Sequence, residues 1–199
     1  MSSAPASFSS TLLAVADKAG GFIAALRRPP VGNGAVPEPV GAVDLARYAG
    51  IWFEYARYEN GFERDCEAVT AQYTPLADGG IQVVNRCRKG GLDGPVKLIK
   101  GKAKVLAGSG NAKLKVSFFG PFFLGDYWVL EHDPDYAWSI VGEPSGRFLW
   151  VLTRQSAPSA ATVQVIETGL RNLGYDTGMI RKTRHGPTDP AVADAAVTA

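Results

Sequence analysis

The stretch Gly50-Ile51-Trp52-Phe53-Glu54-Tyr55-Ala56-Arg57-Tyr58 decides the fold, and residues 43–48 introduce it. A tryptophan two residues after a glycine, at the start of an aromatic run that cannot all be solvated, is typical of the closing point of an all-β shell. We therefore expect the segments that follow Tyr58 to be strands that complete this shell.

Turn-forming residues recur about every ten residues after this stretch, which is the spacing of short antiparallel strands. They separate eight runs, at 50–58, 66–74, 80–88, 96–106, 112–119, 125–132, 136–142 and 147–153. Short turns between consecutive strands predict an all-β fold, an eight-stranded up-and-down antiparallel β-barrel that holds its own side chains or one small ligand. A helix at 160–173, ended by Gly174, is expected to pack outside the barrel, and 178–182 to add a short ninth strand.

Composition limits the class of protein. The chain has 199 residues, of which 46% are hydrophobic, and its 21 basic and 19 acidic residues leave a net charge of +2. This length suits one domain with a real core, and the small, dispersed charge argues against a nucleic-acid partner. No window reaches the roughly 18 consecutive apolar residues of a membrane-spanning helix.

The two ends of the chain differ in composition from its middle. Residues 1–42 join an apolar run to a Pro/Gly-rich stretch, without the charge order of a secretory signal or the cysteine of a lipoprotein signal. We expect either a disordered extension or an amphipathic helix on a membrane surface or on the barrel, followed by an extended linker. The barrel domain is expected at 43–184 and a disordered tail at 185–199.

Alternation along the strands predicts which side chains line the interior. The lysines of the segment 100–104 must face water, so its neighbours and the following run supply the inward row: Ile99, Gly101, Ala103, Val116 and Phe118. The small residues in this row leave volume that a solid core would fill, although a strand glycine also marks bends of a barrel.

A hairpin of the second and third runs brings the two cysteines together. Pairing Thr74 with Gly79 puts Cys66 opposite Cys87 and gives the interior row Cys66, Ala68, Thr70, Gln72, Ile81, Val83, Asn85 and Cys87. Amides in such a row favour a lined cavity, since a buried unpaired amide costs ~1 to 3 kcal/mol. The cysteines form either a disulfide or two reduced thiols. A catalytic thiol or a metal site is disfavoured, because no histidine lies in the strands beside them.

Glu54 is the acidic side chain that the opening stretch sends inward, if Trp52 also points inward. A carboxylate in an apolar cup is costly unless it is paired. We therefore expect Glu54 to bond Asn85 or Thr70, or to meet the polar head of a ligand.

Three blocks in order resemble the signature of the lipocalins: Gly50-Ile51-Trp52, Asp133-Pro134-Asp135-Tyr136, and Arg154 after residues 149–153. Residues 44–54, 113–122 and 149–154 further resemble the Blc-type bacterial lipocalins, which are close to plant temperature-induced lipocalins and apolipoprotein D. The resemblance covers 43–183. It implies structural roles for Gly50, Trp52, Asp133, Tyr136 and Arg154, with Arg154 stacked on Trp52 at the closed end. It also implies that Trp150 lies in the ligand pocket.

The resemblance and the strand pattern together predict non-covalent binding and transport of a fatty acid or lysophospholipid, in membrane maintenance or stress response. An apolar wall suits an acyl chain, and the expected ligand-binding residues are Glu54, Thr70, Asn85, Ile99, Ala103, Val116, Phe118 and Trp150. The alternative is a lipocalin-fold enzyme acting on a lipid or isoprenoid, with Glu54 as acid or base or a cysteine as nucleophile. We expect no cofactor and no metal.

The expected partner is a small amphipathic lipid. Aromatics at 118–123 are expected in a loop at the mouth of the barrel, where they contact a membrane surface or a second copy of the chain. The assembly is then a monomer or a weak homodimer. The resemblance implies the cell envelope, periplasm or outer membrane, while the missing signal keeps the cytoplasm open as an alternative.

Overall fold

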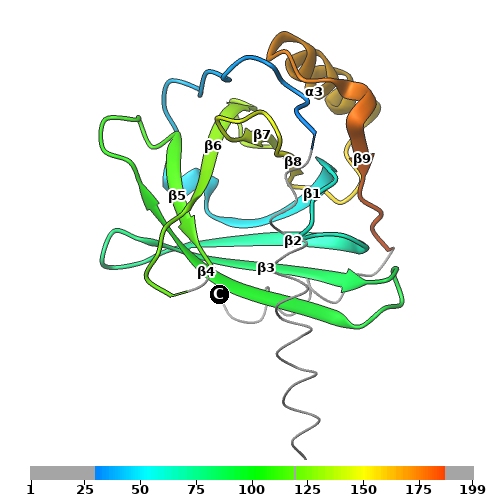
Figure 1. Ribbon diagram of the computed structural model, residues 1–199, viewed down its shortest axis with the longest axis horizontal. Coiled ribbons are helices and arrows are strands. Elements are labelled where there is room, and N and C mark those ends of the chain that lie inside the picture. The colour runs from blue at the N-terminus through cyan, green and yellow to red at the C-terminus, as the bar shows by residue number, and fades with distance from the viewer. Residues whose placement is uncertain (1–29, 119, 187–199) are drawn as a thin grey trace, which may run out of the picture.

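A single antiparallel sheet forms most of the computed structural model, which describes residues 30–118 and 120–186. Its strands follow one another in chain order as β1 (Gly50–Tyr58), β2 (Cys66–Pro75), β3 (Ile81–Lys89), β4 (Val96–Val105), β5 (Lys113–Ser117), β6 (Gly125–His132), β7 (Trp138–Gly142) and β8 (Leu149–Thr153). Each strand pairs with the next, and β1 pairs with both β8 and β2, so that the sheet closes on itself. The predicted eight-stranded up-and-down barrel is confirmed (Figure 1).

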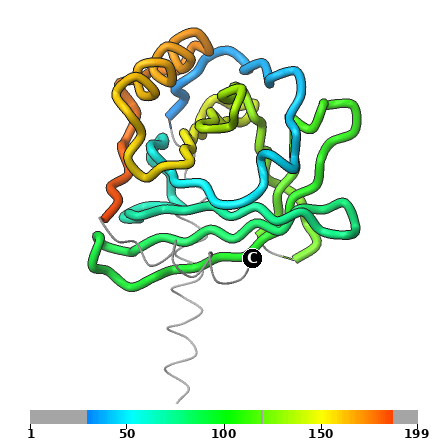
Figure 2. The backbone as a smooth tube through the Cα atoms, turned by 180° about the vertical axis from the view of Figure 1, so that it is seen from behind, coloured from blue at the N-terminus to red at the C-terminus, as the bar shows by residue number. Residues whose placement is uncertain are grey.

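The predicted helix lies outside the barrel as α3 (Ala160–Asn172). The Ser159 side chain accepts from the backbone N–H of Thr162 and begins the helix. Ile166 and Leu170 are buried against the outward-facing side chains of β1, β6, β7 and β8. Figures 1 and 2 show α3 on the side of the barrel away from β3 and β4.

A ninth strand follows α3, as expected. The 3-10 turn η1 (Thr177–Met179) leads into β9 (Ile180–Lys182), which pairs with the second half of β1. Because β9 occupies this part of β1, only the first half of β1 pairs with β2. The chain beyond β9 therefore runs between β1 and the start of β2, where the Ala68 N–H donates to the carbonyl of Arg184 at 2.8 Å.

Residues 30–43 are held along the barrel, not free of it as a linker would be. The Gly32 and Val40 N–H groups donate to the carbonyls of Gly146 and Val129, at 2.9 and 3.0 Å. These bonds give the backbone of a Pro/Gly-rich segment its partners. The short helix α2 (Leu45–Tyr48), capped by Asp44, then leads into β1. The expected N-terminal extension before residue 30 and the tail from 187 lie outside the described residues.

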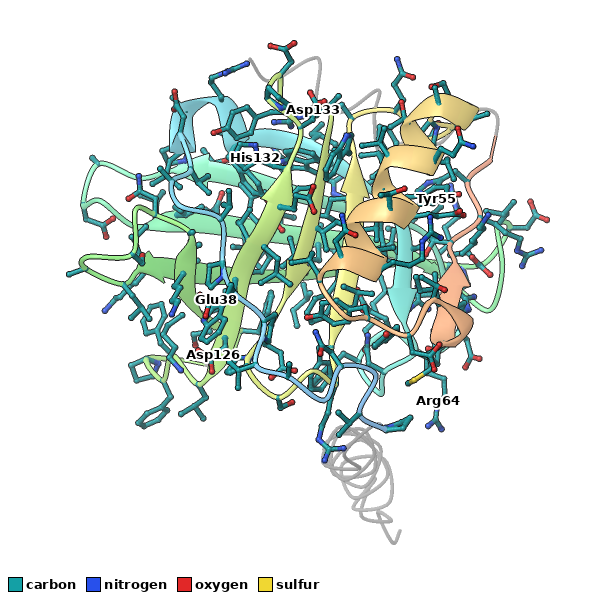
Figure 3. The ribbon with its side chains drawn as sticks, turned by 90° about the horizontal axis from the view of Figure 1, so that it is seen from above. Glu38, Tyr55, Arg64, Asp126, His132 and Asp133 are labelled. Carbon is teal, nitrogen blue, oxygen red and sulfur yellow. A yellow bond between two sulfur atoms is a disulfide. The ribbon has the colours of Figure 1, made fainter. Side chains whose placement is uncertain are left out.

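Buried side chains lie on both sides of the barrel wall. Inside the closed end are Trp52, Val129, Val141 and Leu152, next to a second inner group of Ile81, Val83, Ala103 and Leu114. Outside, α3 covers a third group that includes Ile140, Leu149 and Val151. Figure 3 shows the two ends of the barrel, with Asp133 in the turn at the closed end and Arg64 in the loop at the open end.

The predicted register of the β2–β3 hairpin is wrong beside the turn, and a β-bulge in β2 shifts the pairing again further along. Thr74 pairs with Gln82, not Gly79, and the pairing with β3 shifts between Glu67 and Thr70, around Ala68, whose φ is +49°. A bulge inserts one extra residue and so reverses the inward and outward sides of the strand beyond it.

The consequence is that Thr70 and Gln72 do not face the interior. Trp52, which is inside, pairs with Ala71, and Thr70 pairs with Phe53 on the outer side. Ala71 and Tyr73 therefore face inward in their place. The part of the row on β3 is unaffected, since Ile81, Val83 and Asn85 alternate without a bulge.

Candidate functional site in the barrel interior

The inner wall brings together most of the predicted ligand-binding residues. Register places Asn85 beside Ile99, and Ala103 beside Val116. Ala103 is fully buried, whereas Asn85, Ile99 and Val116 are only half-buried although they face inward. Since side chains on this face point away from the outer surface, their exposure means that solvent reaches the inner wall.

Phe118 fills the space that the glycine of β4 leaves. A Cβ on Gly101 would lie 2.6 Å from the Cδ1 of Phe118 and 2.6 Å from the carbonyl oxygen of Ser117. Gly101 therefore accommodates an aromatic ring packed against the strand, and the expectation that it leaves open volume is wrong. Phe118 itself stays on the inner wall, packed against the group around Ala103.

Trp150 joins the inner wall to the loop at the mouth. Its indole N–H donates to the Glu63 carboxylate at 2.8 Å, and the Asn60 side-chain amide donates to the same carboxylate oxygen at 2.7 Å. Phe148 stacks on Trp150 with ring centroids 5.9 Å apart, and Phe62 packs on Phe148 at 6.1 Å. The loop 59–65 therefore closes against the side of the mouth that Trp150 forms.

Sequence reasoning missed Glu63. Its position depends on Asn60, whose side-chain oxygen accepts from the backbone N–H groups of Phe62 and Glu63, both at 3.0 Å. An asparagine that bonds the backbone two and three residues on is a recognised turn-forming pattern. That local signal predicts a turn at Asn60 but says nothing about Trp150, which is distant in sequence.

Glu54 forms a buried ion pair with Arg57. The Arg57 Nη1 donates to the Glu54 Oε1 at 2.6 Å, and the Thr183 hydroxyl bonds both groups. Arg57 is 0% exposed and its Nη2 also donates to the carbonyl of Glu63 at 2.8 Å. The prediction that Glu54 bonds Asn85 or Thr70 is wrong. Glu54, 2% exposed, lies behind this network and does not line the open part of the wall.

A second bulge explains the error. The pairing of β1 with β8 shifts between Glu54 and Ala56, so that Arg57 takes the inward side. Ala56 and Tyr58, which simple alternation sends inward, instead lie under α3.

The network around Arg57 holds more acidic groups than basic ones. Burial raises the pKa of Glu54 to about 8, the nearby Glu63 adds to this rise, and Arg57 opposes it. Burial alone would lower the pKa of Arg57, yet its carboxylate neighbours, Glu54 first, raise it. Three carboxylates, those of Glu54, Glu63 and Glu59, lie around one guanidinium that stays charged, so that the surplus negative charge favours a proton on Glu54.

A chain of hydroxyls lies deeper inside, towards the closed end. The Tyr127 hydroxyl is 2.8 Å from that of Tyr48 and 3.0 Å from that of Tyr73, and Tyr48 is 3.2 Å from the Ser139 hydroxyl. Burial raises the pKa of Tyr48 to about 12 and also raises the pKa values of Tyr73 and Tyr127. These groups are therefore polar and uncharged. Sequence reasoning missed Tyr73 because the bulge in β2 turns it inward.

The residues of the closed end surround Arg154. Its guanidinium lies 3.7 Å from the centroid of the Trp52 ring, and it donates to the carbonyls of Ile51 at 2.7 Å and Arg47 at 2.8 Å. The Trp52 indole N–H donates to the Tyr48 carbonyl at 2.8 Å. These contacts join β1, α2 and the end of β8 with bonds to backbone oxygens.

The other signature residues hold the turns around this arginine. The Tyr136 hydroxyl accepts from the backbone N–H of Asp44 at 2.8 Å. The Asp133 carboxylate accepts from the N–H of Asp135 at 2.8 Å, inside the turn between β6 and β7. Gly50 has φ +93°, a left-handed conformation that glycine adopts without steric cost.

Cys66 and Cys87 form a disulfide, with their Cα atoms 5.5 Å apart. In the observed register Cys66 is opposite Lys89, so the bond is diagonal across the two strands. No free thiol remains. Among the described residues no group of His, Cys, Asp and Glu is placed to hold a metal ion, and no helix is long and apolar enough to cross a membrane.

Comparison with known proteins agrees with this geometry. Residues 43–185 match the model of the lipocalin-like domain. The chain is 38% identical to the outer membrane lipoprotein Blc of Vibrio cholerae over 144 residues, 72% of this chain and 83% of that protein. It is 37% identical to temperature-induced lipocalin-1 of Arabidopsis thaliana over 162 residues, covering 77% and 85% of the two chains.

Solved structures show the same fold at low identity. Insecticyanin from the tobacco hornworm Manduca sexta superposes with a TM-score of 0.64 at 18% identity, over 80% of this chain and 88% of that one. With the closed barrel, the arginine stacked on the tryptophan of the first strand and these matches, the chain belongs to the lipocalin family, whose fold implies the binding of a small hydrophobic ligand.

Proposed function

We propose that this lipocalin binds and carries a single-chain amphipathic lipid, a fatty acid or a lysophospholipid, with the acyl chain inside the barrel. The observation that carries the proposal is an inward-facing wall of apolar and aromatic side chains that solvent reaches: Ile99, Val116, Phe118 and Trp150. Each methylene that such a wall removes from water contributes about 0.8 kcal/mol to binding. Membrane maintenance or stress response is the setting we propose for this transport.

The distribution of charge suggests how the lipid is oriented. The ionisable side chains of the interior, Glu54, Arg57 and Glu63, gather at the mouth, and the deeper end carries neutral tyrosine hydroxyls. A charged head group costs several kcal/mol when it is moved into an apolar interior. We therefore place the head group near Glu63 and Trp150 and the end of the acyl chain towards Tyr127.

Titration with palmitic acid and with palmitoyl-lysophosphatidylcholine tests the proposal, with tryptophan fluorescence as the readout. We expect saturable binding of one lipid per chain. Trp150→Phe removes the bond to Glu63 and part of the aromatic wall, and should weaken binding roughly ten-fold. Native mass spectrometry of protein purified from its own source would then identify the bound lipid by mass.

Trp128→Phe is the matched control, since this tryptophan lies on the outer side of β6 under Lys113. It should leave lipid affinity unchanged. Absence of saturable binding for both lipids would contradict the proposal. So would equal losses in the two tryptophan variants, because an outer residue would then matter as much as an inner one.

The enzymatic alternative has less support in the geometry. The family consists typically of binders that do not catalyse reactions. Glu54 is enclosed by Arg57 and Thr183, and both cysteines are bonded. Glu54→Gln separates the two functions, since loss of turnover of a lipid substrate with unchanged lipid affinity would favour the enzyme.

A further inference from the structure

The hairpin of β3 and β4 carries one third of the basic side chains of the chain and almost none of its acidic ones. Residues 81–105 hold seven basic side chains and one acidic side chain, Asp93, although the whole chain has 21 basic and 19 acidic residues. Outside this hairpin acidic residues therefore outnumber basic ones, by 18 to 14. The small net charge hides a strongly asymmetric distribution.

Strand alternation gathers these charges on the outer face. Ile99 and Ala103 face inward, so Lys100, Lys102 and Lys104 face outward, and all three are exposed. Arg86 lies on the same side of the neighbouring strand, where the strand register places it opposite Leu98. Like-charged side chains on one face repel one another. Their combined positive potential attracts a negatively charged partner.

Little of this charge is neutralised within the described part of the chain. Arg86, Lys100 and Lys102 have no ion-pair partner among the described residues, and Lys104 lies 4.3 Å over the ring of Phe123. By contrast, Lys115 on the adjacent β5 pairs with Asp126 at 2.7 Å. The unneutralised face is thus confined to β3 and β4, on the side of the barrel away from α3 (Figures 1 and 2).

Exposed apolar side chains lie beside these charges. Val96 and Leu98, at the start of β4, are 59% and 44% exposed. Phe122 and Leu124 are 69% and 83% exposed in the loop between β5 and β6, whose Phe123 contacts Lys104. Large apolar side chains beside unpaired lysines fit the boundary of a lipid bilayer, where the charges meet head groups and the apolar groups enter the acyl region.

We propose that the outer face of β3 and β4 docks on an anionic phospholipid bilayer. The unpaired basic charges supply the attraction, and the four exposed apolar residues supply the insertion. Residues 1–29 are a poor alternative occupant, because they hold three basic residues and one acidic residue and do not complement this face. Docking here is independent of the proposed lipid ligand, since these side chains point away from the interior.

Co-sedimentation of the full chain with vesicles tests this inference. We expect binding to vesicles of phosphatidylcholine with 30% phosphatidylglycerol, loss of binding to pure phosphatidylcholine vesicles, and weaker binding as salt rises. Lys100→Ala with Lys102→Ala should weaken partitioning roughly 30-fold, given the typical contribution of one lysine near an anionic surface. Phe122→Ser with Leu124→Ser should remove most of the binding that persists at high salt.

Arg171→Ala with Lys182→Ala is the matched control, because it removes the same charge from exposed positions on α3 and β9. It should leave partitioning unchanged. Equal losses in the two charge variants would overturn the inference, as would equal binding to neutral vesicles. Preferential binding of a labelled RNA oligonucleotide over the anionic vesicles would assign the face to nucleic acid and overturn it too.

The lysine variant also separates this inference from the proposed function. Its affinity for palmitic acid in solution should equal that of the unmodified chain, because the inner wall is intact. Failure of vesicle binding with normal fatty-acid binding would refute docking alone. Failure of fatty-acid binding in the unmodified chain would refute the proposed function alone.

Discussion

Each end of the barrel uses an arginine, and the two arginines have different partners. At the closed end Arg154 covers the Trp52 ring and donates to backbone carbonyls, among them those of Ile51 and Ala49. At the open end Arg57 is fully buried and bonds the carboxylate of Glu54. Arg154 therefore has neutral hydrogen-bond partners, whereas the partners of Arg57 include an ionisable carboxyl group.

This difference means that the contacts at the closed end do not change with pH, whereas those at the open end do. Carbonyls and an indole ring do not titrate, so the contacts of Arg154 persist across the pH range in which the protein is folded. Arg57 is surrounded by the carboxylates of Glu54, Glu59 and Glu63, and the carboxylate of Glu63 also holds the loop against Trp150. We infer that the closed end maintains the barrel, while the open end responds to protons and to the ligand.

Breaking the closed end should have the largest effect. Trp52→Ala removes a fully buried ring together with the surface on which Arg154 rests, and should lower the free energy of unfolding by about 3 to 5 kcal/mol. Urea unfolding followed by circular dichroism measures the loss. Trp128→Ala, at a half-buried outer position, should cost less. An equal cost would contradict a special role for the closed end.

Removing the disulfide tests whether the two strands near the mouth need a covalent bond. Cys66 and Cys87 are separated by 21 residues, so Cys66→Ser with Cys87→Ser should cost about 3 kcal/mol of folding stability, from the larger entropy of the unfolded chain. Urea unfolding with and without dithiothreitol measures this. The reductant should destabilise the unmodified chain and leave the variant unchanged; a chain insensitive to it would contradict the prediction.

The smallest expected effect is that of Glu54→Gln near pH 6. With a pKa of about 8 in the folded state, against an ordinary value of 4.5, the folded chain binds an extra proton between these two values. Folding stability contributed by Glu54 is therefore complete below pH 4.5 and decreases as the pH rises towards 8. The glutamine variant should lack this decrease, and near pH 6 it should unfold within about 1 kcal/mol of the unmodified chain.

Urea unfolding at a series of pH values measures this dependence. Glu167→Gln, on α3, is a control that should keep the pH profile of the unmodified chain. A loss of about 3 to 5 kcal/mol in Glu54→Gln near pH 6 would contradict the prediction, because that is the cost of breaking an ionised buried pair. Such a result would mean that the contacts of the open end, like those of the closed end, do not change with pH in this range.

Local sequence was enough to place the strands and the helix. Glycine, proline and aspartate at the turns fix where strands end, and these signals act within a few residues. The β4 lysines likewise showed which side faces water, because alternation is a local rule. The family signature added the contact of Arg154 with Trp52, which joins residues far apart in the sequence.

Bulges were the main cause of error, since each depends on a partner strand. At Ala68 the backbone N–H turns to the carbonyl of Arg184, a residue beyond β9, and no local pattern near Ala68 indicates this. The same bulge exchanged Thr70 for Tyr73 on the inner wall and so produced the hydroxyl chain. The bulge in β1 turned Arg57 inward as the partner of Glu54.

The sequence by itself determined the barrel, its closed end and the outward direction of the β4 lysines, because turn chemistry and strand alternation act over a few residues. Only the tertiary structure decided which polar groups meet inside and how the charge is distributed outside. Glu63 reaches Trp150, and Arg86 joins the face of Lys100, through the register between strands. Register depends on hydrogen bonds between distant segments, which a local pattern does not contain.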